Sequence, residues 1–148
     1  GGERTFGVYL EGPGTRVTLH NVHAAGSLGT SINQGLYVWY AEAELAGGSY
    51  TARGGQYARA IENYGGTLTA AGITALGEEG TSGSYALKTY GTSSSDITRS
   101  VLEGDSASID NPTGTATVSH TRLTGPVSGT CTCVGVSEGA NFYADTCP

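Results

Sequence analysis

The chain has 148 residues and a formal net charge of −6, which argues against a nucleic-acid-binding protein because such proteins need clustered Lys and Arg. No apolar run reaches the roughly 18 residues that a membrane-spanning helix requires. The length suits one domain, and the regular spacing of the apolar residues argues against disorder.

Short runs rich in β-branched and aromatic residues follow one another along the chain, separated by glycine-rich turns. Apolar residues in these runs alternate with period two, which is typical of half-buried strands. Apolar spacing of three and four residues is never sustained, so no amphipathic helix is expected. The sequence therefore predicts short β-strands at 7–10, 16–19, 36–39, 67–69, 97–98 and 116–119.

One aliphatic residue leads each unit of a repeat, and these positions stand 28, 25, 26 and 22 residues apart. A period in the twenties indicates a stack of like units. A propeller blade needs about 40–45 residues, and antiparallel sandwiches show no such period. We therefore predict an all-β chain that forms a right-handed parallel β-helix of about five to six rungs, with the hand taken from the rule for parallel crossovers.

Stacked rungs bring equivalent residues into columns at a spacing of about 4.8 Å. Two apolar residues five apart follow each leading residue, so three inward columns are predicted. They are Val8–Leu36–Ile61–Leu87–Ile109, Val17–Leu45–Leu68–Ile97–Val118 and Val22–Tyr50–Ile73–Leu102–Leu123.

Three cysteines, Cys131, Cys133 and Cys147, lie close together near the end of the sequence. A disulfide from Cys133 to Cys147 would close a 15-residue loop, which gives about 3 kcal/mol in the chain-entropy treatment. We predict that disulfide, with three reduced thiols as the alternative. No metal or other cofactor is expected, because no fourth ligand for zinc has suitable spacing. The predicted organisation is β-helix rungs over 1–130 and a C-terminal capping segment over 131–148.

The first rung has no evident cap, although terminal repeats normally need one. A bare end exposes unpaired strand edges. We therefore expect upstream sequence, a protein partner or self-association to cover the residues near Gly1 to Val8.

Several segments resemble a known group of proteins. The closing part of the sequence, at 108–111, 117–119, 123–130 and 133–136 with Asn141, Phe142 and Cys147, resembles the last rungs of bacterial right-handed β-helix repeat proteins of the broad pectate-lyase-like class. The segments 7–9 and 35–37 resemble earlier rungs of the same group. The resemblance implies a secreted or cell-surface protein whose C-terminal cysteine pair clasps the last rung. Cys131 departs from that pattern, which leaves Cys131 as an alternative to Cys133 as the partner of Cys147.

Residues that follow the leading aliphatics are expected to point outward and form one exposed strip. Its simplest interpretation is a solvated ladder of cross-strand pairs, each contributing about 0.2–1 kcal/mol. A second interpretation is a glycan site, because flat aromatic rings pack on sugar rings and carboxylates accept hydroxyl hydrogens. The residues of this candidate strip are Tyr9, Tyr37, Trp39, Glu62, Tyr64, Lys88, Tyr90 and Asp110.

No catalytic residues are predicted. Asp96, Asp105, Asp110 and Asp145 occupy different rung positions, whereas lyases and hydrolases of the β-helix kind group their carboxylates. The expected function is a non-catalytic structural β-solenoid of an extracellular or cell-surface assembly such as an adhesin, fibre or envelope component. The alternative is a glycan-binding module of a phage tail fibre or secreted carbohydrate-active protein, with polysaccharide as partner. A polysaccharide lyase or hydrolase is the third possibility, and neither nucleic acid nor membrane insertion is expected.

Overall fold

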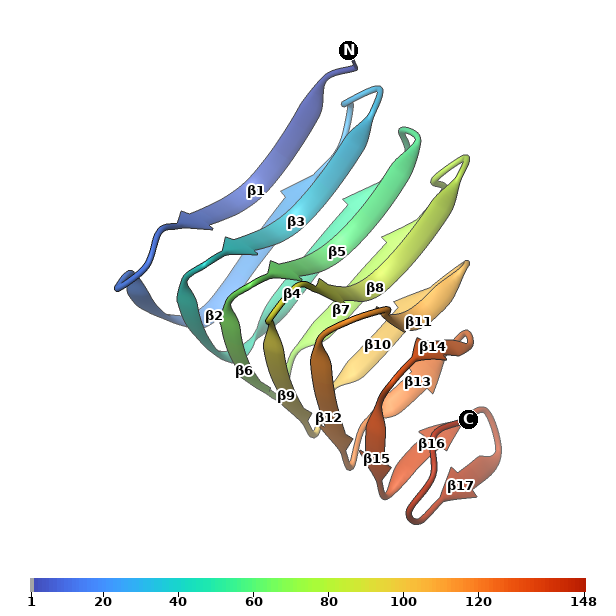
Figure 1. Ribbon diagram of the computed structural model, residues 1–148. Helices are drawn as coiled ribbons and strands as arrows, with labels where there is room; N and C mark the ends of the chain where they lie inside the picture. The colour runs from blue at the N-terminus through green and yellow to red at the C-terminus, as the bar shows by residue number, and fades with distance from the viewer. Residues whose placement is uncertain (1) are drawn as a thin grey trace.

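The computed structural model describes residues 2–148, so the part of the expected N-terminal contact that falls on Gly1 lies outside the described residues. This part of the chain contains 17 β-strands and no helix, and therefore no helix that could span a membrane. Parallel strands stack in about five turns and form a β-solenoid with three faces (Figure 1). The prediction of an all-β fold built from stacked parallel coils is confirmed.

Each turn contributes one strand to each face, and we name the faces A, B and C in chain order. Face A contains β1 (Arg4–Glu11), β3 (Ile32–Trp39), β5 (Tyr57–Tyr64), β8 (Gly83–Tyr90), β11 (Ala107–Asn111) and β14 (Val127–Gly129). Face B begins with the first halves of β2 (Arg16–Gly26) and β4 (Glu42–Arg53) and continues with β6 (Thr67–Ala71), β9 (Ser94–Thr98), β12 (Thr115–Ser119) and β15 (Thr132–Val134). Face C begins with the second halves of β2 and β4 and continues with β7 (Thr74–Glu78), β10 (Val101–Gly104), β13 (Arg122–Thr124), β16 (Val136–Glu138) and β17 (Asn141–Tyr143).

A left-handed backbone residue turns the corner between faces B and C. Asn21 has a φ of 51° and Gly47 a φ of 70°, and at this point the long strands β2 and β4 bend from one face into the next. Glycine adopts this conformation without strain, and Asn tolerates it better than most residues. This left-handed turn, which in β4 also includes Gly48 with a φ of 94°, reverses the alternation of side chains, so that apolar residues point inward on both arms.

The first predicted column is confirmed by the strand register. Val8 pairs with Leu36, Leu36 with Ile61, Ile61 with Leu87, and Leu87 with Ile109. The last four are fully buried, and Val8 is partly buried. This column is the centre of the hydrophobic core.

Three of the four neighbour pairs predicted for the second column are wrong, each by two residues. Leu45 lies beside Leu19 and Ala70, whereas Leu68 lies beside Ala43 and Ser95. Face-B strands have two inward positions two residues apart, and the large residue stands at the second position in β4, β9 and β12 but at the first in β6. Leu68 of β6 is thereby matched with small residues on both neighbouring strands. The pairing of Ile97 with Val118 is as predicted.

The third predicted column is wrong for the same reason. On face C, Tyr50 pairs with Ala24 and Ala75, where Val22 and Ile73 were expected. Leu102 also pairs with Ala75. The small alanine side chain leaves room for the ring of Tyr50 on one side and for the branched chain of Leu102 on the other. The predicted neighbours Leu102 and Leu123 are paired.

The two ends of the solenoid differ (Figure 1). At the C-terminal end the strands shorten to three residues, and β17 pairs antiparallel with β16. At the N-terminal end β1 and β2 have 8 and 11 residues, each paired to a neighbouring strand on one side only. The inward side chains of Val8, Val17, Leu19 and Val22 are only partly buried there.

Candidate functional site

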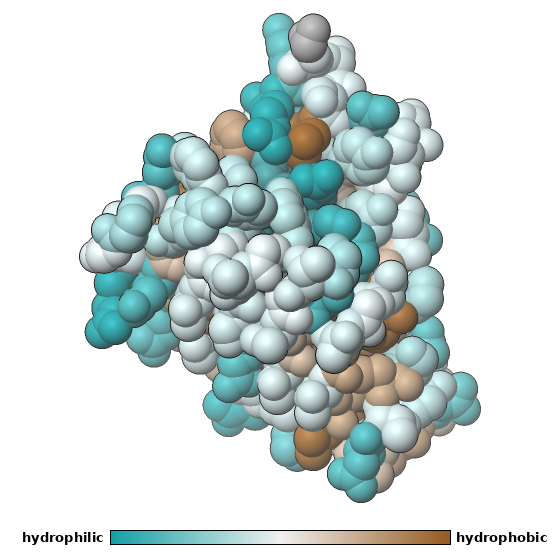
Figure 2. All heavy atoms as spheres, viewed as in Figure 1, coloured by the Kyte–Doolittle hydropathy of each residue, from teal (hydrophilic) through white to brown (hydrophobic). Residues whose placement is uncertain are grey.

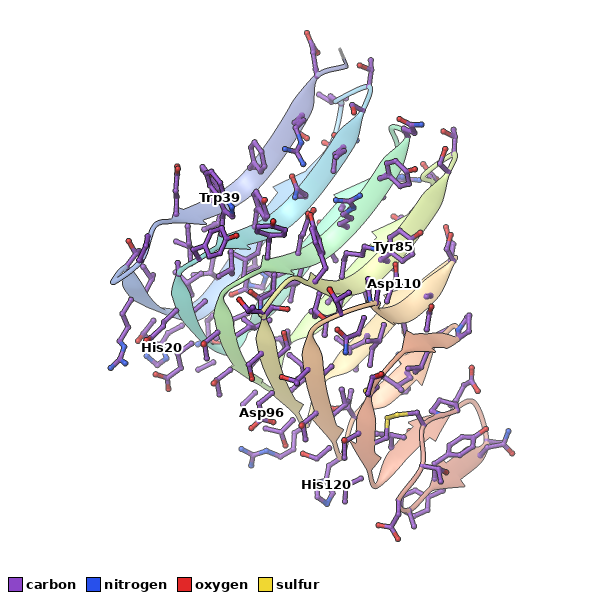
Figure 3. The ribbon with its side chains drawn as sticks, viewed as in Figure 1. His20, Trp39, Tyr85, Asp96, Asp110 and His120 are labelled. Atoms are coloured by element: carbon purple, nitrogen blue, oxygen red, sulfur yellow. A yellow bond between two sulfur atoms is a disulfide. The ribbon has the colours of Figure 1, made fainter. Side chains whose placement is uncertain are left out.

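The outer surface of face A holds all eight residues of the candidate strip. Tyr9, Tyr37, Glu62, Lys88 and Asp110 follow one another on consecutive strands as a single ladder. Trp39, Tyr64 and Tyr90 form a second ladder that starts at Glu11. Figure 3 shows Trp39 and Asp110 on the strands of face A, whereas His20, Asp96 and His120 lie on or beside face B.

A third ladder on the same face was not predicted. Phe6, Gln34, Arg59 and Tyr85 pair across consecutive strands and lie three residues before the first ladder. A regular strand would separate outward residues by two. Here two successive residues face inward in each rung, as shown by Gly35, whose hydrogens point at Thr51 of the opposite face, and by buried Leu36.

A signal for this irregularity exists in the sequence. A small residue precedes the leading aliphatic in every rung: Gly7, Gly35, Ala60, Ala86 and Ser108. These five residues have no cross-strand partner, although the residues on either side of each are paired, because the strand bulges where the small residue turns inward. Reading the small–aliphatic pair as two inward residues would have placed the third ladder on face A.

The expectation that the whole strip is exposed is wrong for Glu62 and Tyr37. The Glu62 side chain is completely buried, and Tyr37 is 8 % exposed. Side chains of the unpredicted ladder cover Glu62. Arg59 Nη1 donates to Glu62 Oε2 at 2.8 Å, and Gln34 Nε2 also donates to Oε2. The hydroxyl of Tyr90 donates to the other carboxylate oxygen.

These contacts bind the Glu62 carboxylate to groups of the protein itself. Burial lowers the pKa of the Arg59 guanidinium, but the charge and hydrogen bond of Glu62, with nearby tyrosines, together outweigh burial and leave that pKa raised. The Arg59 guanidinium is therefore charged at neutral pH, and it forms an ion pair with the buried Glu62 carboxylate. This pair lies within β5, and the hydrogen bonds from Gln34 on β3 and Tyr90 on β8 are the ones that tie Glu62 to neighbouring strands.

The ammonium of Lys88 is also bound by groups of the protein itself. Its ammonium forms an ion pair with Asp110 of the next strand, and the two side chains are 19 % and 14 % exposed. The same ammonium lies 5.1 Å from the ring centroid of Tyr85 and 5.9 Å from that of Tyr90, within cation–π range. The charged residues of the strip thus form one ion pair among themselves, between Lys88 and Asp110, while Glu62 pairs with Arg59 outside the strip.

Aromatic rings gather in a first group at the N-terminal end of face A. Phe6, Tyr9 and Tyr37 stack with centroid separations of 5.2, 5.9 and 5.4 Å. The guanidinium of Arg4 lies 6.0 Å from the Phe6 centroid and 5.9 Å from that of Tyr37. Phe6 and Tyr9 are 39 % and 40 % exposed, so their rings remain available for contacts.

A second aromatic group lies at the corner between faces A and B. Trp39 and Tyr40 are 6.0 Å apart, Tyr40 contacts Tyr64 edge-on at 5.3 Å, and Tyr64 contacts Tyr90 edge-on at 4.8 Å. Trp39 and Tyr40 line an open hollow of about 210 Å³ together with Glu11, Gly12 and Pro13. A larger hollow of about 330 Å³ lies on face B, between Arg16, Glu42, Ala43, Glu44, Thr67 and Thr69.

The exposed charges of the other faces also bridge consecutive rungs. Arg16 pairs with Glu42 at 2.5 Å, and Arg122 pairs with Glu103 at 2.6 Å. Arg53 pairs with Glu79 at 2.5 Å, and this contact lowers the pKa of the Glu79 carboxyl. Most of the surface in view is hydrophilic or neutral, with small, separate hydrophobic groups (Figure 2).

The predicted disulfide joins Cys133 and Cys147 with a sulfur–sulfur distance of 2.08 Å. Cys131 remains a thiol, with its Sγ 3.7 Å from that of Cys133. Burial raises the pKa of the Cys131 thiol to about 11, so it is protonated at neutral pH. The three sulfurs lie within 4.8 Å of one another, but two of them are used in the disulfide and offer no thiolate to a metal.

Alkaline titration should separate the buried tyrosines of face A from the exposed ones. Burial, reinforced by the charge of Glu62, raises the pKa of Tyr37 to about 12 and lifts that of Tyr90 well above its usual value. Between about pH 10 and 12 the unfolded chain releases protons that the native state keeps, so stability falls as the pH rises through this interval. Tyrosinate absorbance should show late ionisation in the native chain, and Tyr37→Phe should remove part of it. An unchanged titration of that variant would contradict the burial of Tyr37.

The geometry of this face and the stacked coils define the chain as a β-solenoid protein. No family model matches it, and no curated protein or solved structure is significantly similar to it.

Proposed function

We propose that this chain is a non-catalytic structural β-solenoid of an extracellular or cell-surface assembly, as a fragment of or a partner in a larger adhesin, fibre or envelope component. One observation carries the proposal: the first rung presents two long strand edges beside an interior that is only partly covered. Long, flat strand edges are templates for pairing with further strands. The end formed by β1 and β2 is accordingly the proposed contact with a protein partner or with a second copy.

The charged side chains of face A support a structural role. The buried carboxylate of Glu62 and the ammonium of Lys88 are both held by partners on the same face. A general acid or base must reach its substrate within about 3 Å, and a carboxylate at zero exposure offers no such access. These groups tie the rungs together and make the solenoid rigid.

The disulfide between Cys133 and Cys147 supports the extracellular setting, because disulfides persist in oxidising compartments. Membership of the pectate-lyase-like class is part of the proposal and rests on the resemblance of the rung segments described above.

Turnover of acidic polysaccharides tests the proposal against the catalytic alternative. The chain and its Glu62→Gln variant would be incubated with a panel of uronate-containing and neutral polysaccharides, with and without calcium. We expect no new reducing ends and no unsaturated products from either protein. Turnover by the parent chain that Glu62→Gln abolishes, with circular dichroism unchanged, would overturn the structural function and identify an enzyme.

Glycan binding is the second candidate, and it is favoured by the hollow beside Trp39 and Tyr40. An aromatic wall with a carboxylate at its rim, here Glu11, suits the apolar face and the hydroxyls of a sugar ring. A glycan array would test this with Trp39→Ala as the site variant. Phe142→Ala is the matched control, since Phe142 is 71 % exposed on β17 at the other end of the chain. Binding lost in Trp39→Ala alone would support the glycan site, and binding equal in both variants would remove it.

A further inference from the structure

The corner between faces B and C passes through the same backbone position in every rung. The residue at this position comes directly after the face-B ladder His20–Ala46–Ala71–Thr98–Ser119–Val134. Its φ lies between 48° and 70° in every rung, which is the left-handed region that favours glycine. The corner residues are Asn21, Gly47, Gly72, Arg99, His120 and Gly135.

Two consecutive rungs have a large side chain at this corner. Arg99 has a φ of 48° and His120 a φ of 49°. The rungs on either side have glycine there, at Gly72 and Gly135. The two large residues are neighbours across the rungs, because the Arg99 N–H donates to the Ser119 carbonyl at 3.1 Å. A side chain in the left-handed region costs stability, and residues held in this way cluster at functional sites.

Buried hydroxyls hold the backbone of these two rungs in place. The Ser100 hydroxyl donates to the Thr98 carbonyl and the Thr121 hydroxyl to the Ser119 carbonyl, both at 2.8 Å. Each hydroxyl also accepts a backbone N–H of the preceding rung, at 3.2 Å. In the other rungs the residue after the corner has no hydroxyl; these residues are Val22, Gly48, Ile73 and Val136. The additional support is therefore confined to the rungs that carry Arg99 and His120.

The side chains of Arg99 and His120 are available to a ligand. Both are exposed, and neither makes an ion pair within residues 2–148. Figure 3 shows His120 at the end of β12, pointing away from the solenoid. A guanidinium has several N–H donors and a positive charge, and an imidazole donates at least one N–H in either protonation state. Beside them the Ser119 hydroxyl donates to that of Thr98 at 3.1 Å on the outer surface of face B.

We infer that Arg99 and His120 bind an acidic group of a polysaccharide at this corner. Consecutive rungs are about 4.8 Å apart, so both side chains reach one carboxylate or sulfate. The guanidinium forms paired hydrogen bonds with such a group, and the imidazole donates a further one. The hydroxyls of Thr98 and Ser119 suit the hydroxyls of a sugar. A membrane surface would need apolar side chains at the corner, whereas the neighbouring rungs have only glycine there.

Binding of the 148-residue chain to immobilised polymers tests the site. Polygalacturonate carries carboxylates, dextran sulfate carries sulfates, and dextran carries neither. We expect the chain to bind at least one acidic polymer, to bind less as salt is added, and not to bind dextran. Tighter binding to one of the acidic polymers identifies the acidic group. A parent chain that binds neither acidic polymer at low salt overturns the inference.

Glycine at either corner position should change binding and stability in opposite directions. Arg99→Gly removes the guanidinium and should weaken binding by about tenfold, and His120→Gly by about fivefold. Both variants relieve the left-handed strain, so the Tm followed by circular dichroism should rise by about 2–5 °C. A residue with a purely structural role would change the Tm alone. Glycine variants that are more stable but bind like the parent therefore contradict the site.

Arg16→Gln is the control for net charge. Arg16 is an exposed arginine of the same face in the first rung, so its loss changes the net charge of the chain by the same amount. Binding should stay within about twofold of the parent. An equal loss in Arg16→Gln and Arg99→Gly would indicate attraction to the whole chain and would remove the corner site.

Gly72→Arg tests the site in the opposite direction. A Cβ added at Gly72 meets no atom within 4 Å, so a third basic side chain fits next to Arg99. This variant should bind about threefold more tightly and lose about 2–5 °C in Tm. Binding at the parent level would argue that the polymer does not touch the corner. The structural function is decided separately, because a chain that binds no acidic polymer is still a non-catalytic solenoid if it turns none over.

Discussion

Replacing Arg59 with Met is expected to lower the free energy of unfolding by about 3–5 kcal/mol, because it leaves an uncompensated charge in the protein interior. Glu62 is completely buried and its ion-pair partner is Arg59, at 2.8 Å. Met fills much of the space of the Arg stem but supplies neither the charge nor the hydrogen bond. Urea denaturation followed by circular dichroism measures the loss.

The double variant Arg59→Met with Glu62→Gln is the control for this experiment. Removing both charges leaves no isolated ion in the interior, so the double variant should recover much of the lost stability. Gln at this position also keeps an oxygen to accept from the Tyr90 hydroxyl. If Arg59→Met lowers the free energy of unfolding by less than about 1 kcal/mol, the loss is the size expected for an exposed ion pair. That result would contradict the buried position of Glu62.

Replacing Ile61 with Ala is expected to cost about 2–5 kcal/mol, the range for deleting a large aliphatic from a packed core. Ile61 is fully buried and lies between Leu36 and Leu87 in the column that the repeat predicted. Strand pairing fixes the rungs on either side, so Leu36 and Leu87 have little freedom to move in and close the cavity. Denaturation monitored by circular dichroism gives the change.

Ile61→Val is the matched control, and it should cost only about 0.5–1.5 kcal/mol because a single methylene group is removed. The larger deletion should also broaden the unfolding transition. Stability in stacked repeats is approximately a sum of terms between neighbours, and a cavity in the middle rung uncouples the two halves. Equal losses in both variants would contradict the central position of Ile61.

The column of leading residues could be predicted because each rung of face A has one large aliphatic at a constant place in the repeat. The columns of faces B and C could not. There the inward positions come in pairs, and Leu45 faces Ala70 while Leu68 faces Ala43. A shift of two residues keeps every side chain on the same face of a strand, so hydrophobic alternation alone does not distinguish the two registers.

The candidate strip was predicted as a set of positions, and the structure places all eight on face A. The exposure of its members depended on residues that the sequence pattern left out. Arg59 and Gln34 occupy the third ladder because two adjacent residues turn inward in every rung, and they cover Glu62. Whether an outward residue is exposed is decided by its neighbours on the face, which for Glu62 are Arg59 on the same strand and Gln34 and Tyr90 on adjacent turns.

By itself the sequence determined the class of fold, the leading core column and the cysteine pair that closes the last rung. These follow from local period and loop length, since a stack of like units repeats its spacing along the chain. Only the tertiary structure decided the burial of Glu62 and the register of faces B and C. Both depend on contacts between turns that are distant in the sequence, and such contacts are formed when the coils stack.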